Sequence, residues 1–193
     1  MASVHGVAQP KLISTSPAAQ SAQASISVVQ LLRKQFGSWL FSQLSLVRIA
    51  DSECERSWKE TFRWIKDRGL HGVEYGVSDA HQGLVNAVHE CFQGASWQRC
   101  QTHFRRNLSD RTPKRHQDAR HGGLDRIFKA DDKNAARQAF NELAAELEGK
   151  ADKAIEMLEL GMEDATAVLD LPEKYHRRLR TTNMLERLIE DGI

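Results

Sequence analysis

The sequence has few cysteines, few prolines and no long apolar run. Three cysteines, Cys54, Cys91 and Cys100, are spread over 193 residues. This odd, sparse set argues against a disulfide scaffold and indicates a reducing compartment. No run approaches the roughly 18–20 apolar residues that a membrane-spanning helix needs, which excludes an integral membrane protein of that kind. We therefore expect a cytoplasmic protein without a membrane partner.

Acidic residues are missing from one part of the chain. Residues 1–50 contain no aspartate or glutamate and only four lysines or arginines, and residues 14–25 are rich in Ser, Ala and Gln. From Asp51 onward the composition is that of an ordinary α/β protein. Two interpretations remain open for 1–50: a disordered or targeting arm, or a segment translated out of frame and never selected to fold. The abrupt change at the boundary favours the second.

The sequence also lacks a Gly-rich phosphate loop, a Gly-x-Ser-x-Gly elbow and a His-Glu-x-x-His helix. It does contain two basic clusters, at 99–121 and 174–187, although the formal net charge is only +1. They predict either solvated helix faces or contacts to the phosphate backbone of DNA, which arginine holds through its planar fork. The candidate DNA-binding residues are Arg99, Arg105, Arg106, Lys114, Arg115, Arg177, Arg178, Arg180 and Arg187.

Apolar periodicity predicts helix, strand, helix, strand over 57–101, with room for a parallel crossover, and mostly helix after that. Ser57-x-x-Glu60 is a capping-box pattern that places the start of the first helix at Ser57. The fold class predicted from this order is α/β.

Three features could carry chemistry. Asp79 ends a predicted strand, where α/β sheets place ligand-contacting groups, but it could equally cap the next helix. Glu186 is either a catalytic acid or the third residue of a helix capped by Asn183. Cys100-x-x-His103 resembles half of a zinc site, but no second pair stands at the right spacing, and a free cysteine is most often a small core residue.

Three motifs in fixed order are more specific than any of these signals alone. They are Gly-Val-Glu-Tyr-Gly-Val-Ser-Asp-Ala-His-Gln-Gly-Leu (72–84), Gly-Ala-Ser-Trp-Gln-Arg-Cys-Gln-Thr-His-Phe-Arg-Arg-Asn-Leu (94–108) and Arg-Thr-Thr-Asn-Met-Leu-Glu-Arg-Leu (180–188). Together they resemble the Mutator-type transposases of bacterial insertion sequences, over roughly residues 51–188.

The resemblance implies a ribonuclease H-like fold with a mostly α-helical insertion and an Asp, Asp, Glu set that holds two Mg²⁺ ions. Asp79 matches the second Asp and Glu186 the last acid, which makes both metal ligands, and Cys100 and His103 match the family's Cys-x-x-His element. The implied partners are DNA, at insertion-sequence ends and targets, and further copies of the chain. The implied division is a partial ribonuclease H-like core at 51–103, the helical insertion at 104–180 and the truncated start of a helix bearing the last acid at 181–193.

The sequence departs from the family at both ends. The first catalytic Asp would precede the helix of Trp58, but residues 1–50 contain no Asp, and the chain stops soon after Leu188. We therefore expect a truncated or frameshifted copy that does not catalyse strand transfer. A non-catalytic DNA-binding protein or transposition regulator is the alternative, and a plain helical interaction domain is the third hypothesis.

Overall fold

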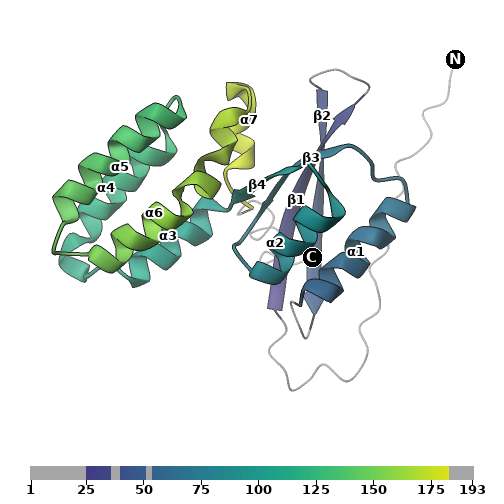
Figure 1. The fold of residues 1–193 in the computed structure, drawn as a ribbon, viewed down its shortest axis with the longest axis horizontal. Coiled ribbons are helices and arrows are strands. Elements are labelled where there is room, and N and C mark those ends of the chain that lie inside the picture. Colours follow the sequence, from purple (N-terminus) through teal and green to yellow (C-terminus); the bar gives the residue numbers. More distant parts are fainter. Residues whose placement is uncertain (1–24, 36–39, 51–53, 183–193) are drawn as a thin grey trace, which may run out of the picture.

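The computed structural model describes residues 25–35, 40–50 and 54–182. It is a mixed α/β structure, mostly helical, in which an α/β part lies beside a helical part (Figure 1). The elements in chain order are β1 (Ser25–Gln35), β2 (Leu40–Ala50), α1 (Glu55–Asp67), β3 (Val73–Ser78), α2 (Gln82–Cys91), β4 (Ser96–Arg99), α3 (Gln101–Asp110), the 3₁₀ turn η1 (Lys114–His116), α4 (Gln117–Phe128), α5 (Lys133–Leu147), α6 (Asp152–Thr166), the 3₁₀ turn η2 (Ala167–Asp170) and α7 (Glu173–Leu179).

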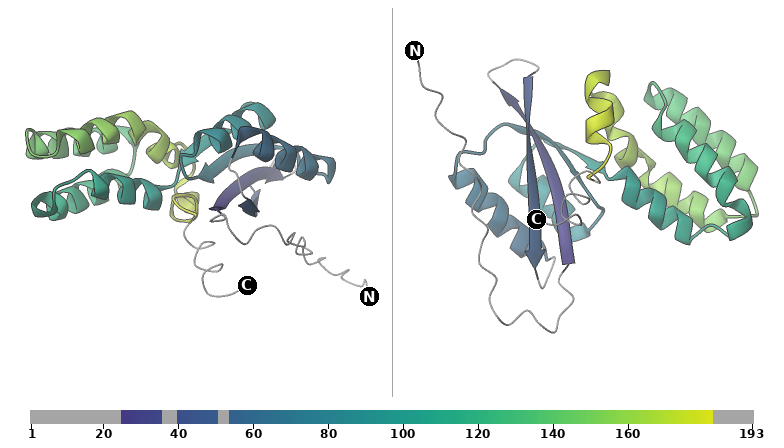
Figure 2. Two further views of the ribbon diagram at one scale, coloured as in Figure 1. Left: turned by 90° about the horizontal axis from the view of Figure 1, so that it is seen from below. Right: turned by 180° about the vertical axis from the view of Figure 1, so that it is seen from behind.

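The sheet is four-stranded in the order β2-β1-β3-β4. β3 and β4 are parallel and joined through α2, as the sequence predicts for 57–101, while β1 pairs antiparallel with both β2 and β3. A view from below shows α1 and α2 together on one face of the sheet (Figure 2). Their buried side chains, including Trp58, Phe62 and Leu84, form one core with Val29 and Trp97 of the strands.

β1 and β2 fall inside the segment 1–50, for which the sequence analysis expected no folded structure. The structure differs there: residues 25–35 and 40–50 are strands, and Val29, Leu31 and Leu32 are buried. The physical reason is visible in the sequence, because both stretches are rich in β-branched and apolar residues that suit a pleated surface. Residues 1–24 lie outside the described part of the chain.

The first helix starts earlier than its capping pattern predicts. α1 begins at Glu55 with Cys54 at the N-cap, so the capping-box interpretation of Ser57 and Glu60 is wrong. The carbonyl of Ser57 accepts a hydrogen bond from Thr61 Oγ1 (3.0 Å), and Glu60 pairs with Arg56 at 3.1 Å on the exposed face. Both residues therefore lie inside the helix rather than at its end.

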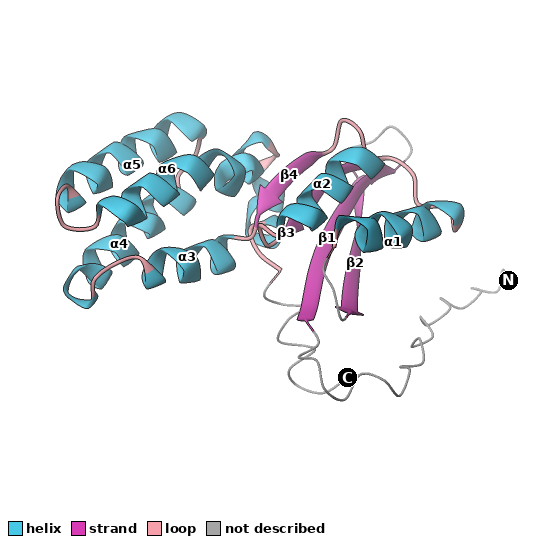
Figure 3. Cartoon of the chain, turned by 60° about the horizontal axis from the view of Figure 1, so that its bottom comes forward, coloured by secondary structure: helices cyan, strands magenta, loops and turns pink. Residues whose placement is uncertain are grey.

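The helical part has a core of its own. Phe104 and Leu108 of α3 pack with side chains of α4, α5 and α6, among them Phe128, Leu143 and Leu158. Ala136, Phe140, Leu143 and Leu147 recur at helical spacing in the sequence, and they lie on the buried face of α5. Figure 3 shows these helices extending away from the sheet, with α3 leading out directly from β4. In the described ranges, none of the helices is long and apolar enough to cross a membrane.

A buried glutamine joins the two parts. Gln98 of β4 is fully buried, and its Oε1 accepts hydrogen bonds from Tyr75 Oη (2.9 Å) and from the backbone N of Val168 (2.7 Å). Its Nε2 donates to the carbonyl of Ala165 (2.7 Å), which also accepts from Gln101 Nε2 (2.8 Å). Burial raises the pKa of Tyr75, which keeps its hydroxyl protonated as a donor. The end of α6 and the start of η2 are thus bonded to β4, an edge strand of the sheet.

Candidate active site at the ends of two parallel strands

Asp79 lies directly after β3, and its backbone is held in place by two neighbours. Ser78 Oγ donates to the carbonyl of Asp79 (2.8 Å) and accepts a hydrogen bond from Trp97 Nε1 (3.0 Å). Trp97 is buried, as expected for a core residue. α2 begins at Gln82 with His81 at its N-cap, so the alternative that Asp79 caps this helix is wrong.

Arg99 ends the neighbouring strand. In the parallel register Arg99 is the partner of Ser78, which brings it beside Asp79. Its guanidinium lies 3.9 Å from the centre of the Phe104 ring and beneath α6, where Gly161 leaves room, since a Cβ there would lie 2.6 Å from Arg99 Nη1. Burial lowers the pKa of Arg99, and the carboxylates of Asp164 and Asp79 oppose that shift. Arg99 is thus a half-buried cation packed in place, not a freely exposed one.

Cys100 follows Arg99 and forms the N-cap of α3, with His103 in the first turn of that helix. Its sulfur is fully buried. Burial acts to raise the pKa of the Cys100 thiol, but hydrogen bonds with His103, Thr181 and Thr182 outweigh it and lower the pKa to about 6. The N-terminus of α3 favours the same ionised form. The half-zinc-site interpretation gains no support, because within the described ranges no three His, Cys, Asp or Glu side chains gather into a metal site.

The segment before the last motif acid also reaches this edge. The backbone N of Gln101 donates to the carbonyl of Arg180 (3.0 Å), and Thr102 Oγ1 lies 2.8 Å from Thr181 Oγ1. Residues 78–79, 99–102 and 180–182 therefore meet at the carboxyl ends of β3 and β4, although they are up to about a hundred positions apart in sequence. Glu186 and Arg187 lie outside the described residues, as does Asn183.

Comparison with known proteins gives this edge a context. The family described as "Transposase, Mutator family" matches residues 43–191, which is most of the chain. The chain belongs to the Mutator family of transposases. Its relatives include the transposase of insertion sequence IS256 in transposon Tn4001 of Staphylococcus aureus, 40% identical over 145 residues. The transposases of ISRM5 from Rhizobium meliloti and of IS1081 from Mycobacterium tuberculosis are 35% and 31% identical.

The matched region is a part of each relative. It covers 74–77% of this chain but only 37%, 37% and 34% of the three relatives named above. The chain therefore spans little more than a third of the length of these transposases.

The candidate DNA-binding residues of this Mutator-family chain do not form one patch. Arg105 is half-buried, and its Nη2 lies 2.8 Å from Asp125 Oδ1. Burial lowers the pKa of Arg105 while Asp125 raises it, and the nearby charge of Arg180 adds to the lowering. Arg180 is half-buried next to the start of α3. These two arginines and Arg99 are thus packed within the structure near the strand ends.

The other candidates are exposed at two separate places. Arg106 lies on α3, and Lys114 and Arg115 follow in η1, beyond the end of a helix about 15 Å long. Arg177 and Arg178 lie on α7, whose buried residues pack toward the sheet. Of these, Arg106, Lys114, Arg177 and Arg178 are exposed and have no ion pair with another described residue.

Sequence reasoning missed several residues of this region. It gave Thr181 and Thr182 no role at the site. It counted Arg120 only within the basic cluster at 99–121, whereas Arg120 is buried and donates from Nη1 to the carbonyl of Arg105 (3.4 Å). The only available signal was the position of both threonines inside the third motif. Their contact with Cys100 depends on tertiary structure.

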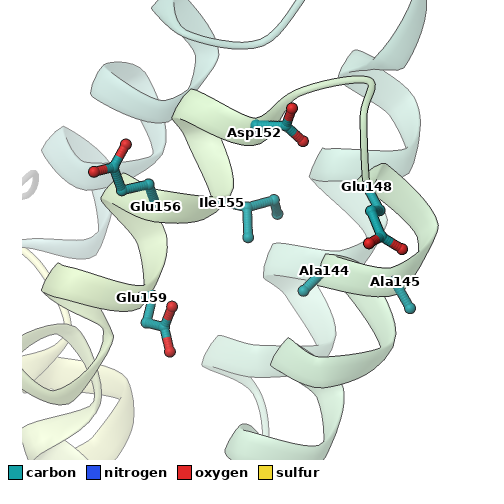
Figure 4. Close-up of a pocket in the computed structure, with 7 residues that line it drawn as sticks. All are labelled: Ala144, Ala145, Glu148, Asp152, Ile155, Glu156 and Glu159. Carbon is teal, nitrogen blue, oxygen red and sulfur yellow. The ribbon is translucent and has the colours of Figure 1, made fainter.

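A groove on the far side of the helical part has the opposite charge. It has a volume of about 470 Å³ and lies between α5 and α6, around Ile155 (Figure 4). Four carboxylates surround it, those of Glu148, Asp152, Glu156 and Glu159. Because these charges repel phosphate, this face is unsuited to DNA, and the exposed cations of α3, η1 and α7 are the better candidates.

Proposed function

We propose that this chain carries part of the catalytic apparatus of a DDE-type transposase, which cleaves and transfers DNA strands at the ends of an insertion sequence. In this proposal Asp79 and Glu186 are two of three carboxylates that hold Mg²⁺ in a ribonuclease H-like core. The single observation that carries it is the docking of 180–182 against Cys100 at the strand ends, beside Asp79. Family membership adds to it.

The distances are compatible with the proposal. The backbone N of Cys100 lies 2.7 Å from the carbonyl of Ser78, the residue before Asp79. Thr182 Oγ1 lies 3.4 Å from Cys100 Sγ. Glu186 follows Thr182 by four residues, which span at most about 14 Å. The last acid is therefore within reach of the edge that carries Asp79.

Carboxylates are the ligands that Mg²⁺ prefers, and when bound a pair of such ions activates the attacking oxygen and stabilises the leaving oxygen of a phosphodiester. Asp79 alone does not make that site, since the described residues hold no group of three metal-ligating side chains. Residues 1–50 offer no Asp to complete it. We infer that these 193 residues bind Mg²⁺ weakly and do not catalyse strand transfer by themselves.

The metal site can be tested without catalysis. Fe²⁺ takes oxygen ligands as Mg²⁺ does, and with ascorbate and peroxide it cuts the protein backbone near its site. We expect cuts close to Asp79 and within 183–193, suppressed by excess Mg²⁺ and abolished by Asp79→Asn. Asp67→Asn, which alters an exposed aspartate at the end of α1, is the matched control and should leave them unchanged. Equal cutting in wild type and Asp79→Asn would refute the assignment.

A second candidate function is that of a non-catalytic DNA-binding protein that regulates transposition. It is favoured by Arg106 of α3 and Lys114 of η1, which are exposed and have no ion pair with another described residue. If Arg106 and Lys114 each neutralise a phosphate, their replacement by Ala should reduce the slope of log K against log salt concentration by about 1.8. Arg105 is unsuitable for this test because it pairs with Asp125.

The control for the salt experiment removes the same charge elsewhere. Lys150→Ala with Lys153→Ala alters two exposed lysines at the acidic end of α5 and α6 and should leave the slope unchanged. Equal reductions in both double variants would mean that only net charge matters. Binding without any cleavage in Mg²⁺ or Mn²⁺ supports the regulatory function, whereas cleavage would contradict the inferred inactivity.

A further inference from the structure

Two segments 80 residues apart meet at the sulfur of Cys100. Thr182 Oγ1 donates a hydrogen bond to Cys100 Sγ at 3.4 Å, and Thr181 Oγ1 lies 3.3 Å from the same atom. Thr102 Oγ1 lies 2.8 Å from Thr181 Oγ1 and extends the contact along α3. Cys100 and Thr182 are both fully buried. Two threonine hydroxyls therefore contact the sulfur atom, and that of Thr102 contacts one of these two.

The backbone of Cys100 is bonded to the other side of the site. Its N–H donates to the carbonyl of Ser78, immediately before Asp79, at 2.7 Å. The next N–H, that of Gln101, donates to the carbonyl of Arg180. One residue thus links the strand end that bears Asp79 to the chain that leads to Glu186.

The chemistry of this position suits a strong hydrogen-bond acceptor. Cys100 is the N-cap of the ten-residue helix α3, where partial positive charge favours an ionised sulfur. Two hydroxyl donors and His103 face it, and Arg180 lies in the adjoining segment. A thiolate with several donors holds its partners more firmly than a neutral thiol, because charge-assisted hydrogen bonds are about twice as strong.

We propose that Cys100 is a positioning residue, whose sulfur fixes Thr181 and Thr182 and thereby holds the start of the Glu186 segment against the end of β3. The proposal rests on the proposed function only in treating Asp79 and Glu186 as partners in one site. The anchoring of 180–182 by the sulfur is a separate statement about the chain. It gives the family's Cys-x-x-His element a mechanical role that requires no zinc.

Hydrogen exchange tests the anchoring in a protein whose other thiols are removed by Cys54→Ser and Cys91→Ser, neither of which belongs to this contact. We expect Cys100→Ala and Thr182→Val to speed exchange in peptides covering 180–193 at least tenfold, while peptides of α5 keep their rates. Cys100→Ser retains a smaller acceptor, so its exchange rate over 180–193 should lie between those of the starting protein and Cys100→Ala. Unchanged exchange over 180–193 in both Cys100→Ala and Thr182→Val would overturn the proposal.

A second measurement separates the hydrogen bond from simple packing. In the same protein Cys100 is the only thiol, so absorbance at 240 nm follows its ionisation. The midpoint should lie near pH 6 and rise by at least one pH unit in Thr182→Val, because the hydroxyl that stabilises the thiolate is lost. A midpoint that does not move would mean that Thr182 only fills space, which contradicts the proposed role.

These readouts use neither metal nor DNA, so the two proposals fail separately. If the Cys100 variants speed exchange but Asp79→Asn leaves Fe²⁺ cutting unchanged, the proposed metal site is refuted and the role of Cys100 stands. If Asp79→Asn abolishes Fe²⁺ cutting but Cys100→Ala leaves exchange unchanged, the proposed metal site stands and the role of Cys100 is refuted.

Discussion

Replacing Gln98 by Leu should lower the free energy of unfolding by about 2–6 kcal/mol. The substitution keeps the size of the side chain but leaves the hydroxyl of Tyr75 and the N–H of Val168 buried without the acceptor they now share. Each buried polar group that loses its partner costs about 1–3 kcal/mol. Ala165 keeps one donor, Gln101, so its carbonyl is not included. Against a total stability of about 5–15 kcal/mol for a typical domain, the loss is large.

The measurement is urea denaturation combined with limited proteolysis. Since Gln98 bonds the end of α6 and η2 to the sheet, we expect Gln98→Leu to make the chain between η2 and Thr182 more sensitive to protease as well as lowering the urea midpoint. Gln93→Leu, at an exposed position after α2, is the matched control and should change stability by less than about 0.5 kcal/mol. Equal stability of Gln98→Leu and wild type would show that this network does not hold the two parts together.

Replacing Phe62 by Ala should lower the free energy of unfolding by about 3–5 kcal/mol. Phe62 is fully buried between two aromatic rings, with ring centres 5.6 Å from Trp58 and 5.0 Å from Phe92. Its loss leaves a cavity in the core between α1, α2 and the sheet, and removes the ring contact between α1 and Phe92 at the C-cap of α2. Chemical denaturation followed by tryptophan fluorescence measures the change, because Trp58 and Trp97 both lie in this core.

Trp64 on the same helix is the control for Phe62. About half of its side chain is exposed, and the guanidinium of Arg68 stacks on it at 3.6 Å from the ring centre. Trp64→Ala removes a larger ring, but only about half of it is buried, so we expect a smaller loss than for Phe62→Ala. Similar losses for Phe62→Ala and Trp64→Ala would contradict the assignment of Phe62 to the core.

Much of the local structure could be predicted because it depends on short-range periodicity. The order helix, strand, helix, strand over 57–101 and the buried stripe of α5 follow from apolar residues at fixed spacings, and both are present in the structure. Helix ends were less predictable. The Ser57 and Glu60 pattern misplaced the start of α1 because Cys54 takes the N-cap without a side-chain hydrogen bond.

The strands β1 and β2 show the limit of composition as a guide. The absence of acidic residues from 1–50 suggested an unfolded segment, yet a strand depends on apolar and β-branched residues and needs no acids. Charge composition and the capacity to pair in a sheet are independent properties. The boundary expected at residue 50 therefore does not coincide with a boundary of the sheet.

The sequence alone determined the family and the two candidate carboxylates, because three ordered motifs are specific even when each signal is weak. Only the tertiary structure decided which polar residues meet. It placed His81 rather than Asp79 at the N-cap of α2, paired Arg105 with Asp125, and brought Thr181 and Thr182 to Cys100. Such contacts join positions 20 to more than 80 residues apart. A hydrogen bond depends on distance and direction in space, and sequence spacing does not determine either one between residues so far apart.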